Sequence, residues 1–399
     1  MESEYDVVVI GAGAFGLSAG LHLARLGLRV SVVDRFRPAS QTSPRAAGLF
    51  KRIQRDRAQS DLARLSNLKV RTFAGEFETP LPIVASGSLF IARTVAHAGA
   101  LRQEAEQAAA WGVELERVDA PEAHRLAPFL ETRGIVAAYH TPDDLYIEEP
   151  SSLLEAYMAA GRRLGLEVWG GSPVDGIDVA GGEVRGVVIG ERTIRTPTVI
   201  DAAGAWAPAV ARLAGAGVTV QPMRHQLLIT QPVAGVDATH PMVRVVDAAA
   251  YVRPARGGLM MGGFETDPLV LEPDQQRGFS VDRMTLDVDV LHRFEPDMER
   301  SVPALEAPLA EVRGGLVTMT PDGRLLVGPV PGVRGLWTCT GCNASGFSLS
   351  PGVGQVLAEW IVDGAPSIDL GTLDPGRFGD LPDAEIRSRA TWQYAHYYG

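Results

Sequence analysis

Three glycines near the start of the sequence have the spacing of a phosphate-binding turn. Gly11, Gly13 and Gly16 form the pattern GxGxxG. In such a pattern the first glycine permits a tight turn, the second lets a phosphate approach the backbone, and the third lets a helix lie close to a strand. Asp34 follows at about the separation at which an acidic side chain would bind a ribose hydroxyl. These residues predict a dinucleotide site, and the alternative is a tight turn without a ligand.

The segments around these glycines have the character that the turn requires. Residues 7–10 are an uninterrupted β-branched run, which is typical of a parallel strand buried on both faces. A helix is predicted directly after the turn, so its free N–H groups and positive dipole end would face a pyrophosphate. Gly27 ends this helix, and residues 28–33 form a second strand leading to Asp34. The spacing alone leaves NAD as plausible a ligand as FAD.

Cys339 and Cys342 form a CxxC pair, which could be a redox-active dithiol or half of a zinc site. No second pair exists to complete four zinc ligands, so we expect no metal site. We expect both cysteines to be small buried residues at the end of a strand, with the dithiol as the alternative.

The composition is that of a globular protein with a sizeable core. The 399 residues are enough for two or three domain-sized units, and the net charge of −11 argues against nucleic-acid or anionic-membrane binding. No apolar run approaches the ~20 residues needed to span a bilayer, and no signal peptide is expected. Two cysteines cannot form a disulfide framework and favour a cytoplasmic location.

One basic stretch interrupts this acidic chain. Eight Lys or Arg residues and two acids lie between Arg45 and Arg71. Leu62, Leu65 and Leu68 have amphipathic spacing, which favours a solvated helix face. The alternative is a role in attracting an anionic substrate or a cofactor phosphate.

The order of the segments predicts two domains, each built from separated pieces, and a tail. An α/β, Rossmann-like nucleotide-binding domain is expected from residues 1–79, 141–215 and 311–370. An α+β substrate domain on a mostly antiparallel sheet is expected from residues 80–140 and 216–310. Residues 371–399 form an aromatic-rich C-terminal tail.

Further elements are predicted inside these pieces. Helices are expected over residues 151–165 and around residues 284–294, and Gly181-Gly182 is expected to turn a hairpin. A second glycine-rich loop leads into a helix at residues 346–354, which is another candidate anion site at a helix N-terminus.

With these separated segments, almost the whole chain resembles the D-amino-acid oxidase superfamily of flavoproteins. The nearest branch resembles the sarcosine and dimethylglycine oxidases and dehydrogenases. The motifs that carry the resemblance are DAAGAWAP at 201–208, PMRHQ at 222–226, YVRP at 251–254, GGLMMGGFETDP at 257–268, TPDGRLLVGP at 320–329 and GFSLSPGVG at 346–354.

The resemblance implies FAD rather than NAD as the cofactor. It places the backbone of Val174 at the adenine, Gly204 and Trp206 over the pyrophosphate, and residues 346–349 at the flavin pyrimidine ring. The complete set of implied cofactor residues is Gly11, Gly13, Gly16, Asp34, Arg35, Arg45, Ala46, Gly48, Val174, Ala203, Gly204, Trp206, Gly346, Phe347, Ser348 and Leu349.

The sequence also departs from the family pattern at four positions. Arg45 and Gly315 stand where family members attach the flavin covalently through histidine or cysteine, so we expect FAD to be held noncovalently. Met260 and Ser348 replace lysines that promote reaction with dioxygen and hold the substrate carboxylate. The resemblance therefore implies neither reactivity with dioxygen nor the family's anchor for the substrate carboxylate.

Four residues are the candidates for catalysis. The resemblance implies a proton-accepting role for His225 and a substrate-facing position for Tyr251, while Arg253 and Arg45 could pair with a substrate carboxylate. The alternatives are a core histidine, ordinary sheet packing and a solvated arginine. Arg45 could also stabilise negative charge on the flavin.

The resemblance implies oxidation of the C–N bond of a secondary or tertiary amino acid, such as an N-methylglycine, to an imine that water hydrolyses. The alternatives are a D-amino-acid or cyclic imino-acid dehydrogenase, and a flavin-bearing electron-transfer subunit with a partner chain. Dioxygen or an electron-transfer protein would be the acceptor.

Overall fold

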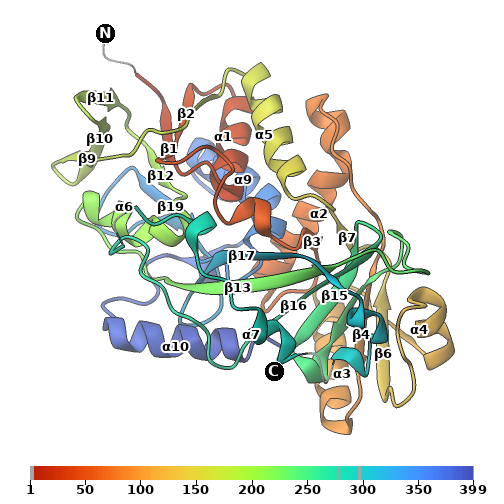
Figure 1. Cartoon of the computed structure of the whole chain (residues 1–399). Helices are drawn as coiled ribbons and strands as arrows, with labels where there is room; N and C mark the ends of the chain where they lie inside the picture. Colours follow the sequence, from red (N-terminus) through yellow and green to blue (C-terminus); the bar gives the residue numbers. More distant parts are fainter. Residues whose placement is uncertain (1–3, 277, 295–297, 399) are drawn as a thin grey trace.

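The computed structural model describes residues 4–276, 278–294 and 298–398. Two large β-sheets organise the molecule, and the long strands β13 (Gln221–Thr230) and β17 (Leu309–Met319) run across its middle (Figure 1). The mixed α/β fold that the sequence predicts is confirmed.

The first sheet has six strands in the order β18-β19-β12-β1-β2-β8. All neighbours are parallel except β18 and β19, which are antiparallel. The strands are β1 (Val7–Ile10), β2 (Val30–Val33), β8 (Glu167–Trp169), β12 (Val199–Asp201), β18 (Leu326–Pro329) and β19 (Leu336–Thr340).

Alternate side chains of β1 enter two different cores, which explains why its β-branched run has no polar position. Val7 and Val9 pack with the helices on one face, whereas Val8 and Ile10 pack on the other face with the three-stranded meander. The helices are α1 (Ala14–Arg25), α2 (Arg57–Phe77), α5 (Ser151–Arg163) and α9 (Gly346–Asp363). The other face carries β9 (Gly176–Ala180), β10 (Glu183–Ile189), β11 (Arg192–Arg195) and α6 (Ala207–Leu213).

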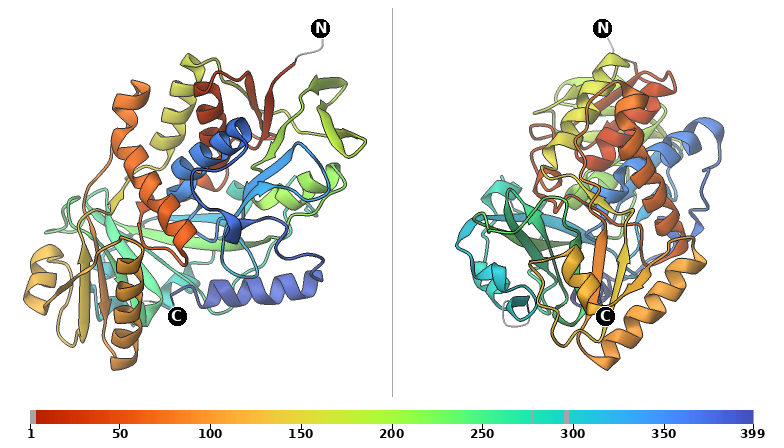
Figure 2. Two further views of the ribbon diagram at one scale, coloured as in Figure 1. Left: turned by 180° about the vertical axis from the view of Figure 1, so that it is seen from behind. Right: turned by 90° about the vertical axis from the view of Figure 1, so that its right-hand side faces the viewer.

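The second sheet has eight strands in the order β17-β13-β16-β15-β14-β4-β6-β5, antiparallel except between β14 and β4. Its other strands are β4 (Ser88–Ala92), β5 (Glu116–Val118), β6 (Ala137–Thr141), β14 (Met242–Val245), β15 (Ala250–Ala255) and β16 (Gly258–Gly263). The helices α3 (Val95–Ala110) and α4 (Ala120–Leu126) lie at its far end (Figure 2). The short strands β3 (Leu49–Phe50) and β7 (Leu145–Tyr146) pair with each other.

The C-terminal segment returns to the middle of the molecule. Helix α10 (Asp383–Ala395) contacts β13 and β17, and it lies along the side of these strands that is remote from α1 (Figure 1). Tyr394, Tyr397 and Tyr398 of the tail therefore pack on the body of the protein, whereas Trp392 is exposed. Gly399 lies outside the described residues.

Two sequence-based boundaries need correction. The helix expected around residues 284–294 is reduced to α7 (Val288–His292), because side chains of β13 hold the preceding segment extended: Gln226 bonds both backbone groups of Asp287. Residues 311–319 were assigned to the nucleotide-binding domain, yet β17 pairs with β13 along its length and so belongs to the eight-stranded sheet.

Among the described residues no helix combines the length and apolarity needed to cross a membrane. Within the same part of the chain, no cluster of three or more His, Cys, Asp or Glu side chains could hold a metal ion.

His22 on α1 makes folding sensitive to acid. The imidazole is buried against Phe77, and burial, with smaller contributions from Lys69 and Arg25, lowers its pKa to about 3. Below pH 6.5 the unfolded chain therefore binds a proton that the folded chain does not. The free energy of unfolding consequently decreases as the pH is lowered. We expect His22→Met to remove about 1.5 kcal/mol of the stability loss between pH 6.5 and 5.

Denaturant unfolding of both proteins at the two pH values measures this effect. Equal losses of stability in the wild-type protein and in His22→Met would contradict it.

Candidate active site

A cavity of about 430 Å³ lies between the two large sheets. Its wall is formed by the ends of β1 and β2, the loops over residues 41–47, 172–175 and 202–206, strands β13, β15 and β17, and the start of α9. Segments far apart in the sequence thus meet at one site.

The glycine turn forms one end of this cavity. Gly11 has φ of +111°, and a Cβ atom there would overlap with the carbonyl oxygen of Ala202. A Cβ atom at Gly16 would overlap with the carbonyl oxygen of Gly11. Gly13 differs, because it has φ of −87° and its Cβ would meet only Ser43 Oγ, at 3.2 Å. The first and third glycines are therefore required by the fold, whereas Gly13 leaves space open towards the cavity.

Asp34 holds the turn from the end of β2. Its two carboxylate oxygens accept hydrogen bonds from the backbone N–H groups of Ala12 and Phe36, both at 2.7 Å. Burial raises the pKa of this carboxyl group, and the two N–H groups oppose the rise. Each oxygen keeps a lone pair for a further donor, such as a ligand hydroxyl.

The start of α9 forms another part of the wall, through Gly346 and Phe347. The preceding residues Asn343 and Ala344 have positive φ values of 41° and 59°, which side-chain-bearing residues rarely adopt. The Asn343 side chain holds this conformation, because it accepts from the backbone N–H of Thr320 at 3.0 Å and donates to the Gly341 carbonyl at 2.6 Å.

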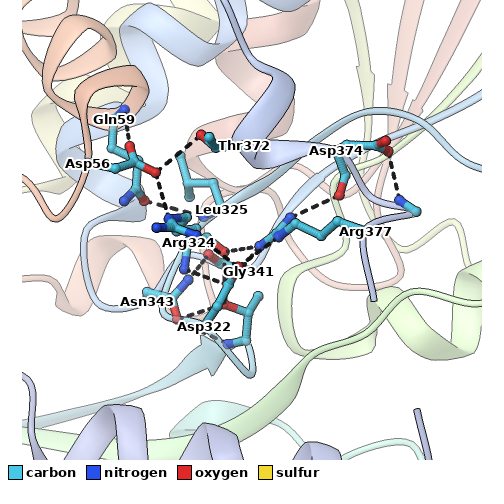
Figure 3. A network of polar contacts seen from close by, with 12 residues as sticks. Asp56, Gln59, Asp322, Arg324, Leu325, Gly341, Asn343, Thr372, Asp374 and Arg377 are labelled. Atoms are coloured by element: carbon cyan, nitrogen blue, oxygen red, sulfur yellow. Dashed lines mark hydrogen bonds and ion pairs between the residues drawn. The ribbon is translucent and has the colours of Figure 1, made fainter. Parts of the chain in front are cut away.

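A network of charged groups lies beside the loop that contains Gly341 and Asn343 (Figure 3). Arg377 donates to both carboxylate oxygens of Asp322, each at 2.9 Å, and Arg324 pairs with Asp56 at 2.8 Å. Asp56 also caps α2 by accepting from the Gln59 N–H at 2.8 Å. The network joins α2, the segment before β18 and the C-terminal region.

His225 and Tyr251 lie together on the cavity wall, from strands β13 and β15. His225 Nε2 is 3.4 Å from the Tyr251 hydroxyl, and its Nδ1 is 2.8 Å from the hydroxyl of Tyr394. Burial lowers the pKa of His225 to about 4, so its imidazole is neutral at physiological pH. Gly262 makes room for the Tyr251 ring, since a Cβ there would overlap with the phenol oxygen.

The two candidate arginines are placed differently. Arg45 lines the cavity and donates to the carbonyl oxygens of Ser40 and Gln41 within its own loop. The sequence also placed Arg253 beside the substrate, but the structure does not bring it to the cavity wall. It is fully buried, and its guanidinium donates to the carbonyls of Ala47, Glu148 and Pro254. These hydrogen bonds within the protein stabilise the buried charge.

Most of the other cofactor candidates also line the cavity: Arg35, Ala46, Val174, Ala203, Gly204 and Trp206. Four do not. The Ser348 hydroxyl donates to the Ser345 carbonyl, and Leu349 packs in the core beside α1. Gly16 packs in the turn, and Gly48 (φ +75°) packs against the Ile147 carbonyl. Their functional roles remain predictions.

Among the described residues, four of the eight cations between Arg45 and Arg71 form ion pairs within the protein: Arg52, Arg57, Arg64 and Lys69. Arg52 pairs with Asp143 and Asp144, and Arg64 pairs with Asp61. Arg45 is the cation of this stretch that lines the cavity.

The sequence did not predict that three further residues lie at the cavity or contact its wall. Ser43 Oγ accepts the N–H of Ala14 at 3.0 Å and so binds the first turn of α1. Cys342 was expected to be buried at the end of a strand, but it is half-buried and lines the cavity, whereas Cys339 is buried in β19. Tyr394 comes from the distant tail, and only its place in an aromatic-rich segment marked it.

Comparisons with known proteins agree with this geometry. Residues 6–360 match the family described as FAD dependent oxidoreductase. The chain is 31% identical to human mitochondrial sarcosine dehydrogenase, over 100% of this chain and 44% of that protein. It is 26% identical to monomeric sarcosine oxidase from Streptomyces avermitilis, over 96% of this chain and 100% of that protein. This chain therefore spans less than half the length of the mitochondrial relative.

A solved structure supports the fold. L-proline dehydrogenase from P. horikoshii superimposes with a TM-score of 0.84 at 23% identity, over 96% of this chain and 100% of that one.

The residues around the cavity fit FAD. The N-cap residues of α1 and α9, Gly13 and Ser345, provide no side-chain cap. Apart from the Ala14 N–H, which Ser43 binds, N–H groups at the two helix starts are therefore available to phosphate or to carbonyl oxygens. Gly13 leaves the close approach to α1 open.

Substitutions in the turn should separate cofactor binding from folding. We expect Gly13→Ala to fold like the wild-type protein but to bind FAD at least tenfold more weakly, because the methyl group occupies the approach of the pyrophosphate. Gly16→Ala should destabilise the apoprotein itself. Urea unfolding and FAD titration measure the two effects, and wild-type FAD affinity in Gly13→Ala would contradict the assignment.

The flavin should be released when the protein is denatured. Arg45 and Gly315 line the cavity where histidine or cysteine would be needed for attachment, so acid precipitation should leave FAD in the supernatant. Cys342 is the thiol on the cavity wall, so it is the residue to which the flavin would be attached if the prediction is wrong. Flavin that stays with the wild-type precipitate but is released from Cys342→Ser would show covalent attachment.

Proposed function

Because this chain belongs to the family of FAD-dependent oxidoreductases, we propose that it oxidises the C–N bond of a secondary or tertiary amino acid, such as an N-methylated glycine. The observation that carries the proposal is the pair formed by His225 and Tyr251 on the wall of the cofactor cavity. FAD is the cofactor of the family, and when bound it supplies the hydride acceptor.

The neutral imidazole of His225 suits the first requirement of amine oxidation. An amino acid enters as an ammonium ion, which must lose a proton before its carbon can give up hydride. Burial keeps His225 uncharged near neutral pH, so Nε2 can accept that proton, directly or through the Tyr251 hydroxyl at 3.4 Å. Tyr251 would also orient the substrate.

Arg45 is proposed to hold the substrate carboxylate. The cations on the described part of the cavity wall are Arg35 and Arg45, and Arg35 follows Asp34 at the turn. Both contacts to the loop carbonyls use Arg45 Nη1. The three N–H groups on Nε and Nη2 therefore remain for a carboxylate.

The relatives support an N-methyl amino acid as substrate class, because the two proteins described above are named for sarcosine, which is N-methylglycine. One is named a dehydrogenase and the other an oxidase. The acceptor is therefore proposed as either an electron-transfer protein or dioxygen. Both cysteines are free thiols, which supports the proposal of a reducing, cytoplasmic compartment.

Anaerobic mixing with a panel of amines tests the proposal. We expect N-methylglycine and N,N-dimethylglycine to bleach the flavin absorbance, and D-alanine to do so at least tenfold more slowly. His225→Gln should slow bleaching by about 100-fold or more at unchanged FAD content, because the proton acceptor is lost. If no N-methyl or D-amino acid bleaches the flavin, amine oxidation is wrong.

A further inference from the structure

Tyr394, on the last turn of α10, lies behind the active-site histidine. Its side chain is fully buried, and its hydroxyl is 2.8 Å from His225 Nδ1 and 3.3 Å from the carbonyl oxygen of Arg224. These two contacts come from a residue 169 positions away from His225 in the sequence.

The two contacts of Tyr394 fix the direction of its hydrogen bonds. A carbonyl oxygen can only accept, so the contact at 3.3 Å is a hydrogen bond only when the single phenol proton is donated to Arg224. The phenol oxygen must then accept from His225, which requires a hydrogen on Nδ1. In neutral imidazole the other nitrogen then has a lone pair, and Nε2 is the nitrogen that faces Tyr251.

We propose that Tyr394 is a positioning residue that holds His225 in the Nδ1–H tautomer, so that the bare Nε2 is presented to Tyr251 and to the substrate cavity. The inference rests on the proposed function only in naming His225 as the proton acceptor. The hydrogen-bond geometry itself is independent of the substrate.

An aromatic cluster keeps this arrangement rigid. Phe264 lies 4.9 Å from the ring of His225 and 5.1 Å from that of Tyr394, measured between ring centroids. Tyr397 stacks on Phe264 at 4.0 Å with an interplanar angle of 11°. The imidazole thus contacts the Phe264 ring and both phenol hydroxyls, which favours one orientation of the ring.

The cluster also provides a matched control. The Tyr397 hydroxyl bonds to Ser345 Oγ at 2.9 Å, whereas the hydroxyl bonded to His225 Nδ1 belongs to Tyr394. Tyr394→Phe and Tyr397→Phe each remove one hydroxyl and keep the ring. A merely structural effect of a lost hydroxyl in this cluster would appear in both variants, whereas loss of tautomer control would appear in Tyr394→Phe alone.

Nitrogen-15 NMR of histidine-labelled holoenzyme tests the tautomer directly, with His225→Gln used to assign the signals. We expect the wild-type protein to show a protonated Nδ1 and a bare Nε2 at His225. Tyr394→Phe should shift the signals towards the other tautomer, while Tyr397→Phe should leave them unchanged. A protonated Nε2 in the wild-type protein would overturn the proposal even if Tyr394→Phe does not fold.

Kinetics of the same variants give a second readout. With a substrate that bleaches the wild-type flavin, Tyr394→Phe should lower the limiting rate at least tenfold with little change in KM, and Tyr397→Phe should do neither. Equal effects in both variants would overturn the proposal. If no amine bleaches the wild-type flavin while the NMR shows Nδ1–H, then the proposed function fails and the role of Tyr394 stands.

Discussion

The antiparallel pairing of β13 with β17 is the constraint on which the rest of the site depends. This ladder runs from Gln221 opposite Met319 to Thr230 opposite Leu309, and it sets His225 opposite Gly315. Because Gly315 has no side chain, the loop at Thr42 can approach β17, and Thr42 exchanges hydrogen bonds with Leu316. One pairing thus holds the imidazole, the cofactor loop and the packing surface for α10 in register.

Local patterns predicted the strand, turn and helix at the glycine end of the cavity well. The strand, turn and helix around Gly11 depend on neighbours within about 30 residues, so spacing alone specifies them. The substrate end was less predictable. Tyr394 reaches His225 only through the tertiary fold, and residues 284–287 lose their helix to hydrogen bonds from β13. Patterns in the sequence carry no information about such distant partners.

The two candidate arginines also show that the sequence does not predict tertiary contacts. A sequence assigns an arginine its charge but not the place where that charge is satisfied. Arg253 is paired with backbone carbonyls in the core and lies over the ring of Tyr146, whereas Arg45 lines the cavity. Burial lowers the pKa of Arg253 to about 10, so it stays charged and holds the Ala47 and Glu148 segments to β15.

The contact between Tyr394 and His225 also has a consequence for biosynthesis. Ribosomes make a chain from its N-terminus, so β13 is synthesised well before α10. A nascent chain that has already paired β13 with β16 still lacks the partner of the imidazole. The hydrogen bond between Tyr394 and His225 would then form as a late event of translation, after the glycine turn has formed.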